Sequence, residues 1–237
     1  MIWLDISFPT PQENILFDDV LLSLAEQHNG PEVLRFWESP TPFVVLGRIG
    51  KVDDDIFLEA ARRDKIPVLR RSSGGGTVLQ GPGCLNFSVI LSKETNPDIF
   101  DLKKSYQFIL GKVIGALQTS GVEAAFKPIS DLALKSNQKK FSGNAQKRGR
   151  KFILHHGTIL YQFDLDQVPK YLRIPKDMPE YRNRRPHLDF VTNIPIEPQS
   201  FKKALRAQFG IREESTTLTD AQWETLNSLV RTKDVLV

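Results

Sequence analysis

Cysteine is nearly absent from this sequence, and its scarcity limits where the protein can work. Cys84 is the only cysteine among 237 residues, so no disulfide can form within the chain. A chain without disulfides suits a reducing compartment. The first residues, Met1–Asp5, carry no basic segment with a cleavage site, and no apolar run approaches about 20 residues. We therefore expect a cytoplasmic protein that does not contact a membrane.

A strong charge of one sign is also lacking. The chain has 32 Lys and Arg against 28 Asp and Glu, a formal net charge of +4. That excess suits an acidic ligand or partner, but it is too small to predict nucleic-acid binding. Much of it is local, at Lys139–Lys140, Lys147–Arg148, Arg150–Lys151 and Arg182–Arg185. A solvated face is the usual reading of such runs, and a groove facing phosphate is the alternative.

One stretch combines glycine with arginine. An apolar run at Ile66–Leu69 leads into Arg70–Arg71, two serines and the three glycines Gly74–Gly76, before apolar residues resume at Val78. This order predicts a strand, a glycine turn and a second strand. Glycines let the backbone approach a ligand closely and expose N–H donors, and neighbouring guanidiniums favour a phosphate or carboxylate. A flexible hairpin with surface arginines explains this stretch, taken alone, equally well.

The rest of the pattern mixes helices and short strands without an internal repeat. Asp18, Asp19 and Glu26 lie outside the apolar stripe of the first predicted helix. Helical spacing of apolar residues predicts helices over 14–27, 53–65, 102–119, 164–172, 199–209 and 219–230. Strands are predicted over 33–37, 43–47, 132–134, 140–142, 151–154 and 155–161. Many hairpins among helices favour an α+β fold over regular βαβ alternation.

Three ordered sequence blocks carry a resemblance to one family. The first is Arg71–Val78 with Gly83 and Asn86–Ser88, similar to R-x-S-G-G-G-x-V…G-N-x-N-Y-S. The second is Asp131–Leu132 with Lys140–Gln146, and the third is His155–Leu160 with Asp164–Leu165. Over about residues 14–172 the chain resembles the catalytic domain of lipoate–protein ligases and octanoyltransferases, and more distantly that of biotin–protein ligases. The G-R-G-R-x-G-R run of biotin ligases is absent.

The resemblance implies a fold and a reaction. The fold would be a class II biotin/lipoate-ligase-like domain, with mixed β-sheets flanked by helices. We expect it to span residues 1–237, with 175–237 forming a loop and two closing helices and no full C-terminal accessory domain. The implied reaction uses ATP and Mg²⁺ to activate lipoate or octanoate as an acyl-adenylate. The acyl group then passes to a lysine of a lipoyl carrier domain, either a 2-oxoacid dehydrogenase E2 or a glycine-cleavage H-type protein.

The same resemblance assigns site residues. Lys140 would polarise the acyl phosphate and stabilise developing charge, and it is the expected catalytic residue. Asp131 would hold Mg²⁺ or the incoming lysine ammonium, or it is simply a turn residue. Adjacent strand histidines point to opposite faces, so only one of the two would reach the site. The implied substrate- and nucleotide-binding residues are Arg71, Ser73, Gly74, Gly75, Gly76, Thr77, Asn86, Asp131, Gly143, His156, Gly157 and Thr158, with Arg70 as a neighbouring electrostatic or structural residue.

The chain departs from the family pattern in ways that leave alternatives open. Cys84 stands where the ligase motif has asparagine, and Gln80–Gly81 replaces the usual His-Asp. Gly81–Pro82–Gly83 resembles one octanoyltransferase branch, so acyl transfer without ATP through a cysteine thioester is the second hypothesis. Neither expected nucleophile position holds cysteine, however, and Lys176 occupies one of them. A non-catalytic ligand-binding relative is a third hypothesis. The short C-terminal part also raises the prospect of a separate accessory subunit.

Overall fold

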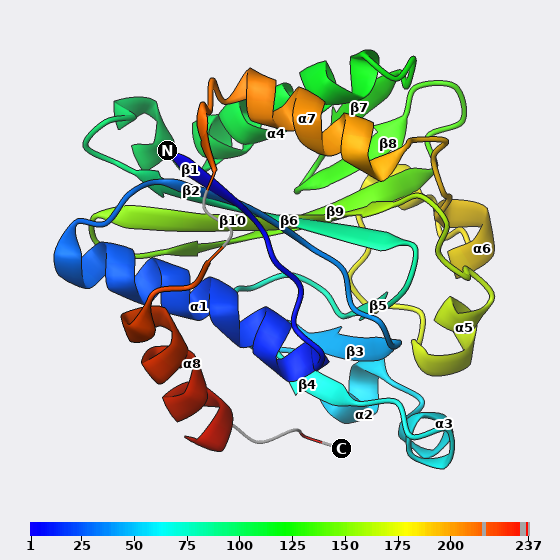
Figure 1. The fold of residues 1–237 in the computed structure, drawn as a ribbon. Helices are drawn as coiled ribbons and strands as arrows, with labels where there is room; N and C mark the ends of the chain where they lie inside the picture. The colour runs from blue at the N-terminus through cyan, green and yellow to red at the C-terminus, as the bar shows by residue number, and fades with distance from the viewer. Residues whose placement is uncertain (215–216, 233–235, 237) are drawn as a thin grey trace.

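Two β-sheets of unequal size organise the chain, in a computed structural model that describes residues 1–214, 217–232 and 236 (Figure 1). Among these residues the larger sheet has eight strands in the order β11-β1-β2-β6-β10-β9-β8-β7. Its strands are β1 Ile2–Asp5, β2 Val33–Trp37, β6 Cys84–Ser92, β7 Ala124–Lys127, β8 Asp131–Leu134, β9 Lys140–Arg148, β10 Phe152–Leu160 and β11 Glu213–Glu214. The smaller sheet has the order β4-β3-β5, with β3 Phe43–Leu46, β4 Val68–Arg70 and β5 Val78–Gln80.

Helices cover both faces of the larger sheet. On one face lie α4 (Leu102–Gln118) and α7 (Pro198–Gln208), and on the other lie α1 (Pro11–His28) and α8 (Asp220–Thr232) (Figure 1). The smaller sheet is accompanied by α2 (Val52–Asp55), α3 (Leu58–Arg63) and α5 (Gln167–Tyr171). The remaining helical turns are α6 (His187–Phe190) and the 3₁₀ helices η1 (Pro97–Phe100) and η2 (Glu180–Arg182). No helix in the described ranges is long and apolar enough to cross a membrane.

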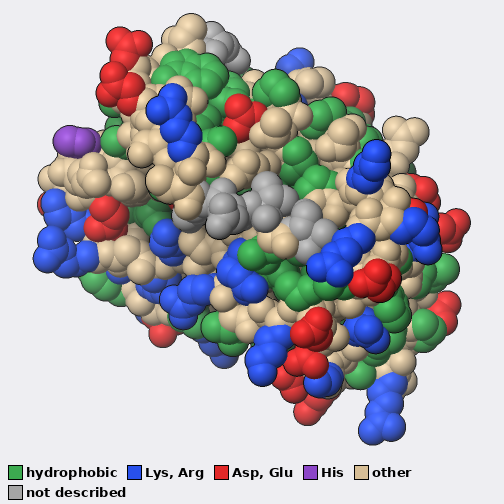
Figure 2. All heavy atoms as spheres, turned by 90° about the horizontal axis from the view of Figure 1, so that it is seen from below, with side chains coloured by type: hydrophobic (Ala, Val, Ile, Leu, Met, Phe, Trp, Pro, Cys, Tyr) green, Lys and Arg blue, Asp and Glu red, His purple; other side chains and the backbone are tan. Residues whose placement is uncertain are grey.

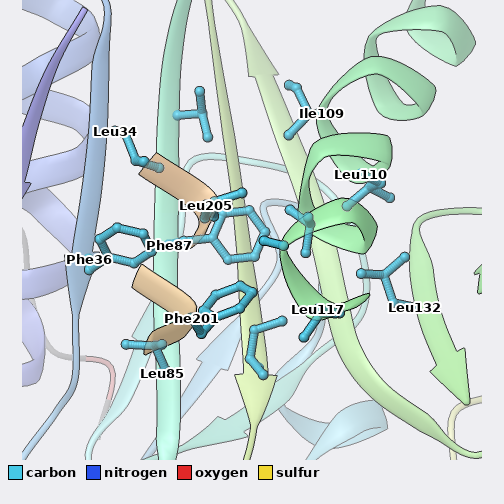
Figure 3. Packing of buried hydrophobic residues seen from close by; sticks show 14 of the residues in the cluster. Leu34, Phe36, Leu85, Phe87, Ile109, Leu110, Leu117, Leu132, Phe201 and Leu205 are labelled. Atoms are coloured by element: carbon cyan, nitrogen blue, oxygen red, sulfur yellow. The ribbon is translucent and has the colours of Figure 1, made fainter. Parts of the chain in front are cut away.

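The main core lies between the larger sheet and the α4/α7 layer. Figure 3 shows Phe36 from β2 and Phe87 from β6 facing Phe201 of α7, with Ile109 and Leu110 of α4 beside them. Each of these side chains is fully buried. Burying one such side chain contributes roughly 1.5–3 kcal/mol, so this layer fixes the large sheet on which the site is built. The mixed sheets and their helical layers confirm the α+β prediction.

Helix α1 begins and ends on local sequence signals. Thr10 caps it, accepting a hydrogen bond from the Glu13 N–H at 3.2 Å while the Glu13 carboxylate accepts from the Thr10 N–H at 3.1 Å. Asn29 ends it in a left-handed conformation. Asp18 and Asp19, which lie outside the apolar stripe, are nevertheless buried. The stripe predicts the helix correctly but not that its polar side also packs against the protein.

The predicted glycine hairpin is wrong in its pairing. Strands β4 and β5, which flank Gly74–Gly76, are not neighbours, because β3 lies between them. β4 runs parallel to β3 and β5 runs antiparallel to it. The glycine segment therefore crosses the end of β3 instead of making a tight turn. A Cβ at Gly47, just after β3, would lie 2.0 Å from the Gly75 carbonyl oxygen, so this crossing requires glycine at position 47.

Two other predicted elements differ from those observed. The single helix expected over 53–65 is split, because Ile56 is extended and forms a bridge with Leu172. Ile56 is only 1% exposed, so the burial gained in this tertiary contact outweighs the helical spacing of the local sequence. The strands expected at 151–154 and 155–161 are one continuous strand, β10. The closing helices are confirmed as α7 and α8, and the predicted loop before them contains η2 and α6.

Charges of both signs are intermixed on the surface. On the face seen in Figure 2, Lys and Arg side chains stand beside Asp and Glu, and apolar side chains lie between them. Of the basic runs, Lys140 and Arg182 line the cavity described below, so part of this positive charge faces the cavity and not only solvent.

Candidate active site

A single large cavity collects most of the predicted site residues. It has a volume of about 610 Å³, within the range of small-molecule sites, and both sheets contribute to its wall. Every residue assigned from the family resemblance lines it except Ser73 and Arg70. Those on the wall are Arg71, Gly74, Gly75, Gly76, Thr77, Cys84, Asn86, Asp131, Lys140, Gly143, His156, Gly157 and Thr158.

The glycine segment presents unpaired donors to this cavity. Arg71 is buried and reaches back to the segment, donating from Nη2 to the carbonyl oxygens of Gly74 at 2.7 Å and Gly76 at 2.8 Å. Within the described part of the chain, the N–H groups of Gly74–Gly76 donate to no protein acceptor. A Cβ at Gly74 or Gly76 would meet nothing within 4 Å. The segment is thus held through its carbonyls and leaves its N–H groups open to an acceptor.

Arg71 adds a positive charge to the same wall. No carboxylate in the described ranges pairs with its guanidinium, whose remaining contacts include the Ser73 hydroxyl at 3.1 Å. Burial lowers the pKa of Arg71 to about 10, so it is still cationic at neutral pH. A buried cation without an acidic partner, beside open N–H donors, favours an anionic ligand. Arg70 lies outside the cavity wall and donates to the carbonyls of Gly47 and Gly50, which makes it a structural residue of the loop after β3.

Lys140 and Asp131 form an ion pair on another part of the wall. The Lys140 Nζ lies 2.8 Å from Asp131 Oδ1, and the side chains are 24% and 10% exposed. Lys140 opens β9, Asp131 opens β8, and Gly143 stands directly opposite Asp131 across the two strands. A Cβ at Gly143 would lie 3.0 Å from the Lys140 Nζ. Glycine at this position leaves room for the lysine to fold back to its partner.

A second carboxylate organises the wall near the glycine segment. Asp18 accepts hydrogen bonds from Arg35 Nη1 at 2.7 Å and Ser88 Oγ at 2.6 Å, and His156 Nδ1 lies 3.7 Å away. Burial alone would raise the pKa of Asp18, but Arg35 and the bonds from His156 and Ser88 hold it below its usual value. The other ring nitrogen of His156 hydrogen-bonds to Ser73 Oγ at 2.7 Å. This network ties α1, β2, β6 and β10 to the glycine segment.

The neighbouring histidines face opposite sides, as predicted. His156 lines the cavity, whereas His155 is fully buried among the core rings of Phe87 and Tyr106. Burial, with a contribution from His156, lowers the pKa of His155 to about 3, so it is neutral at pH 7. Gly157 has a packing reason to be glycine, because a Cβ there would lie 1.9 Å from the Asn144 amide oxygen.

Comparison with known sequences shows the family to which this chain belongs. A sequence model described as the lipoyl protein ligase A/B catalytic domain matches residues 10–210. The chain belongs to this family. Octanoyltransferase LipM of Oceanobacillus iheyensis is 28% identical over 242 residues, covering 91% of this chain and 88% of that protein. Lipoate–protein ligase 1 of Staphylococcus aureus is 30% identical over 200 residues, covering 81% of this chain and 59% of the ligase.

Solved structures show that the fold is shared. A bipartite lipoate protein ligase of Thermoplasma acidophilum, studied with its E2 lipoyl domain, superposes with a TM-score of 0.84 at 22% identity. That match covers 98% of this chain and 92% of the other. A lipoate–protein ligase A bound with ATP gives a TM-score of 0.83 at 20% identity, covering 98% and 94%. The predicted family and its class II fold are confirmed, and the protein is an enzyme of the lipoate ligase/octanoyltransferase family.

The lone cysteine of this family member is poorly suited to attack. Cys84 opens β6 and lines the cavity, but it is only 1% exposed. Burial, together with the charge of Glu38, raises the pKa of its thiol far above the usual value. A thioester route requires a thiolate, and the environment of Cys84 opposes its formation.

Several cavity residues were not found from the sequence. Asp18 and Asp19 are among them, since their helix contains no sign that its polar side faces a ligand. Tyr181, which does not line the cavity but holds the wall residue Asp131, was also missed: its hydroxyl donates to Asp131 Oδ2 at 2.6 Å from a segment expected to be a loop. Of the apolar residues that follow the glycine segment, Val78 and Leu79 line the cavity, while Leu85 and Phe87 on β6 belong to the main core. Strand alternation places Leu85 and Phe87 on one face of β6, but only the tertiary structure shows which layer covers that face.

Proposed function

We propose that this protein is a lipoate–protein ligase that activates lipoate or octanoate with ATP and transfers the acyl group to a lysine of a lipoyl carrier domain. The observation that carries the proposal is the convergence of two cations, Arg71 and Lys140, with the free N–H donors of Gly74–Gly76 in one cavity. An acyl-adenylate presents a phosphate and a polarised carbonyl to such groups. The apolar part of the wall, including Val78 and Leu79, suits an aliphatic chain.

The reaction has two steps that these groups can assist. First, a carboxylate oxygen of the acid attacks the α-phosphorus of ATP, and the bond to the departing pyrophosphate breaks. The glycine N–H groups and Arg71 bind the phosphoryl oxygens, on which charge accumulates. Next, the carrier amine attacks the acyl carbon, the bond to AMP breaks, and the amine loses a proton. The Lys140 ammonium stabilises the oxyanion that forms on the acyl oxygen.

The cavity residues can provide part of the coordination of a Mg²⁺ ion. No cluster of three or more His, Cys, Asp or Glu side chains that could hold an ion occurs in residues 1–214, 217–232 and 236. Asp131, whose two oxygens contact Lys140 and Tyr181, would share at most one of them with Mg²⁺, and phosphate and water would be the remaining ligands. The ion would neutralise charge on the phosphates, while Arg71 and Lys140 act from the protein side.

Octanoyl transfer from an acylated carrier is the second candidate, favoured by the 88% coverage of the LipM relative. The deciding experiment incubates the protein with an apo lipoyl domain and either lipoate plus ATP or octanoyl-acyl carrier protein. Intact mass spectrometry of the lipoyl domain reports its modification. We expect modification with lipoate, dependent on ATP and Mg²⁺. Modification only from the acyl carrier protein, without ATP, would contradict the ligase proposal, and modification from neither would favour the non-catalytic hypothesis.

A cysteine variant separates the two enzymatic routes. Cys84→Ser keeps a small side chain with one hydrogen-bonding group in the cavity wall. A ligase should keep most of its ATP-dependent activity, because no step uses the thiol. A thioester enzyme would lose all measurable transfer, and no acyl adduct of the expected mass would form on the variant.

The carrier and any accessory chain are part of the same proposal. The relative from T. acidophilum is bipartite and was studied with an E2 lipoyl domain. For this protein, an E2 lipoyl domain or a glycine-cleavage H-type protein is the proposed acceptor, and the net charge of +4 would favour encounter with an acidic one. Adding a separately expressed accessory domain to the assay tests whether the adenylation step needs it.

A further inference from the structure

Tyr181 holds the carboxylate that pairs with Lys140. Its hydroxyl donates to Asp131 Oδ2 at 2.6 Å, while Asp131 Oδ1 lies 2.8 Å from the Lys140 Nζ. The two oxygens of one carboxylate are thus assigned to two different partners. If Asp131 rotated about its side chain, both contacts would be lost together, so the phenol and the ammonium are coupled through it.

Tyr181 is itself held in place by the segment that carries it. Its ring packs on Phe190, with centroids 5.3 Å apart, and the Arg182 guanidinium lies 4.6 Å from the centroid of the same Phe190 ring. The segment then joins β9 at Lys140, where Val191 forms a parallel bridge and the Thr192 N–H donates to the Lys140 carbonyl at 2.9 Å. The segment from η2 to Thr192 therefore reaches Lys140 by two routes, through its backbone and through Asp131.

The phenol acts as the donor in this contact, because a carboxylate oxygen such as Asp131 Oδ2 accepts hydrogen bonds. A neutral donor on Oδ2 leaves the negative charge of Asp131 available to Lys140 on Oδ1. The tyrosine can thus fix the orientation of the carboxylate without competing for its charge.

We propose that Tyr181 is a positioning residue, which orients Asp131 so that the Lys140 ammonium is held at the acyl phosphate and carbonyl. It touches no reacting atom itself, and it acts through Asp131. The inference rests on the proposed function, because Lys140 must be catalytic for its position to matter. It holds equally for a ligase and for a transferase, since in both the nucleophile attacks the acyl carbon and an oxyanion develops on the acyl oxygen.

The test removes only the hydroxyl. Tyr181→Phe retains the ring that packs on Phe190. Tyr171→Phe is the matched control, because the Tyr171 hydroxyl donates to Asp64 Oδ2 at 2.9 Å and Tyr171 does not line the cavity. The assay uses whichever acyl donor the wild type accepts. We expect Tyr181→Phe to lower kcat at least roughly tenfold, while the KM values for the acyl donor and ATP change less than about twofold. The control should keep the wild-type kcat. Equal losses in both variants, or a rise in KM alone, would overturn the proposal.

A double-variant cycle tests whether the effect passes through Asp131. Tyr181→Phe is introduced into the wild type and into the Asp131→Asn variant. If Tyr181 acts through Asp131, it should cause little further loss of kcat in the second background. If Tyr181→Phe lowers kcat by the same factor in the Asp131→Asn background as in the wild type, Tyr181 acts elsewhere, and the positioning role is refuted.

A readout without turnover separates this inference from the proposed function. Acetic anhydride at limiting concentration labels lysines, and peptide mass spectrometry gives the labelling rate of each one. Lys140 should label several-fold faster in Tyr181→Phe than in the wild type or in Tyr171→Phe, with Lys139 unchanged as internal reference. An unchanged Lys140 rate would overturn the proposal. If the wild type modifies no carrier with either donor, the function fails, but the labelling rates still decide whether Tyr181 positions Lys140.

Discussion

Two carboxylates on the wall of the same cavity have similar partners and different surroundings. Asp18 lies between the guanidinium of Arg35 and the hydroxyl of Ser88. Asp131 lies between the ammonium of Lys140 and the hydroxyl of Tyr181. The Arg35 side chain is 0% exposed, whereas Lys140 is 24% exposed.

The two pairs differ in whether a substrate can reach the cation, and this difference indicates a structural role for one pair and a catalytic role for the other. The Arg35 guanidinium also donates to the Asn14 and Ile6 carbonyls, so its position is fixed on several sides. Lys140 has a flexible stem and, among the residues that the structure describes, one charged partner, so it can present its ammonium to a substrate. We expect the first pair to determine stability and the second to determine activity.

Removing Arg35 should give the largest effect. Arg35→Met leaves Asp18 buried without its cation, and loss of one partner of a buried pair typically costs about 3–5 kcal/mol. Equilibrium unfolding in urea measures the change. Arg63→Met is the matched control, because Arg63 is 67% exposed in its pair with Asp64, and solvent screening should leave the free energy of unfolding nearly unchanged. A loss for Arg35→Met no larger than that of the control would contradict the structural role of this pair.

Removing Lys140 should affect rate instead of stability. Lys140→Met keeps most of the side-chain volume and deletes the ammonium, and we expect kcat to fall about 10²- to 10³-fold, as for a lost oxyanion donor. Lys139→Met is the control, since the ammonium of the neighbouring lysine donates to the Leu188 carbonyl from an exposed position outside the cavity wall. Carrier modification followed by mass spectrometry gives the rates. If the two variants have similar activity, Lys140 is not the catalytic cation.

The smallest effect concerns the histidines beside the two pairs. The pKa of His155 is lowered to about 3 by burial, whereas the unfolded chain protonates near its ordinary 6.5. Between these values the unfolded state binds more protons, so stability should fall as pH decreases from about 6.5 toward 3, by up to about 1.4 kcal/mol per pH unit. His155→Gln should reduce that slope in urea unfolding measured at pH 7, 6 and 5. An unchanged slope would assign the pH dependence to other groups.

The sequence predicts much of this fold because the relevant signals are local. The capping box at Thr10 and the apolar spacing that follows it suffice for α1, and short runs of β-branched and aromatic residues between turn residues suffice for β2 and β3. The failure at Ile56 has a tertiary cause, since the residue breaks a helical pattern to pair with Leu172, more than 100 positions away. The glycine hairpin failed for the same kind of reason, because β3 separates its two strands.

By itself the sequence determined the family, through three ordered blocks, and with it the expectation that Lys140 and the glycine segment serve one site. Only the tertiary structure decided which side chains support them. Asp18 and Tyr181 acquire their roles from partners on other elements, and their spacing along the chain carries no trace of these contacts. The physical reason is that helix and strand signals act over a few residues, whereas a charge or a hydrogen bond is satisfied by whatever the fold brings within about 3 Å.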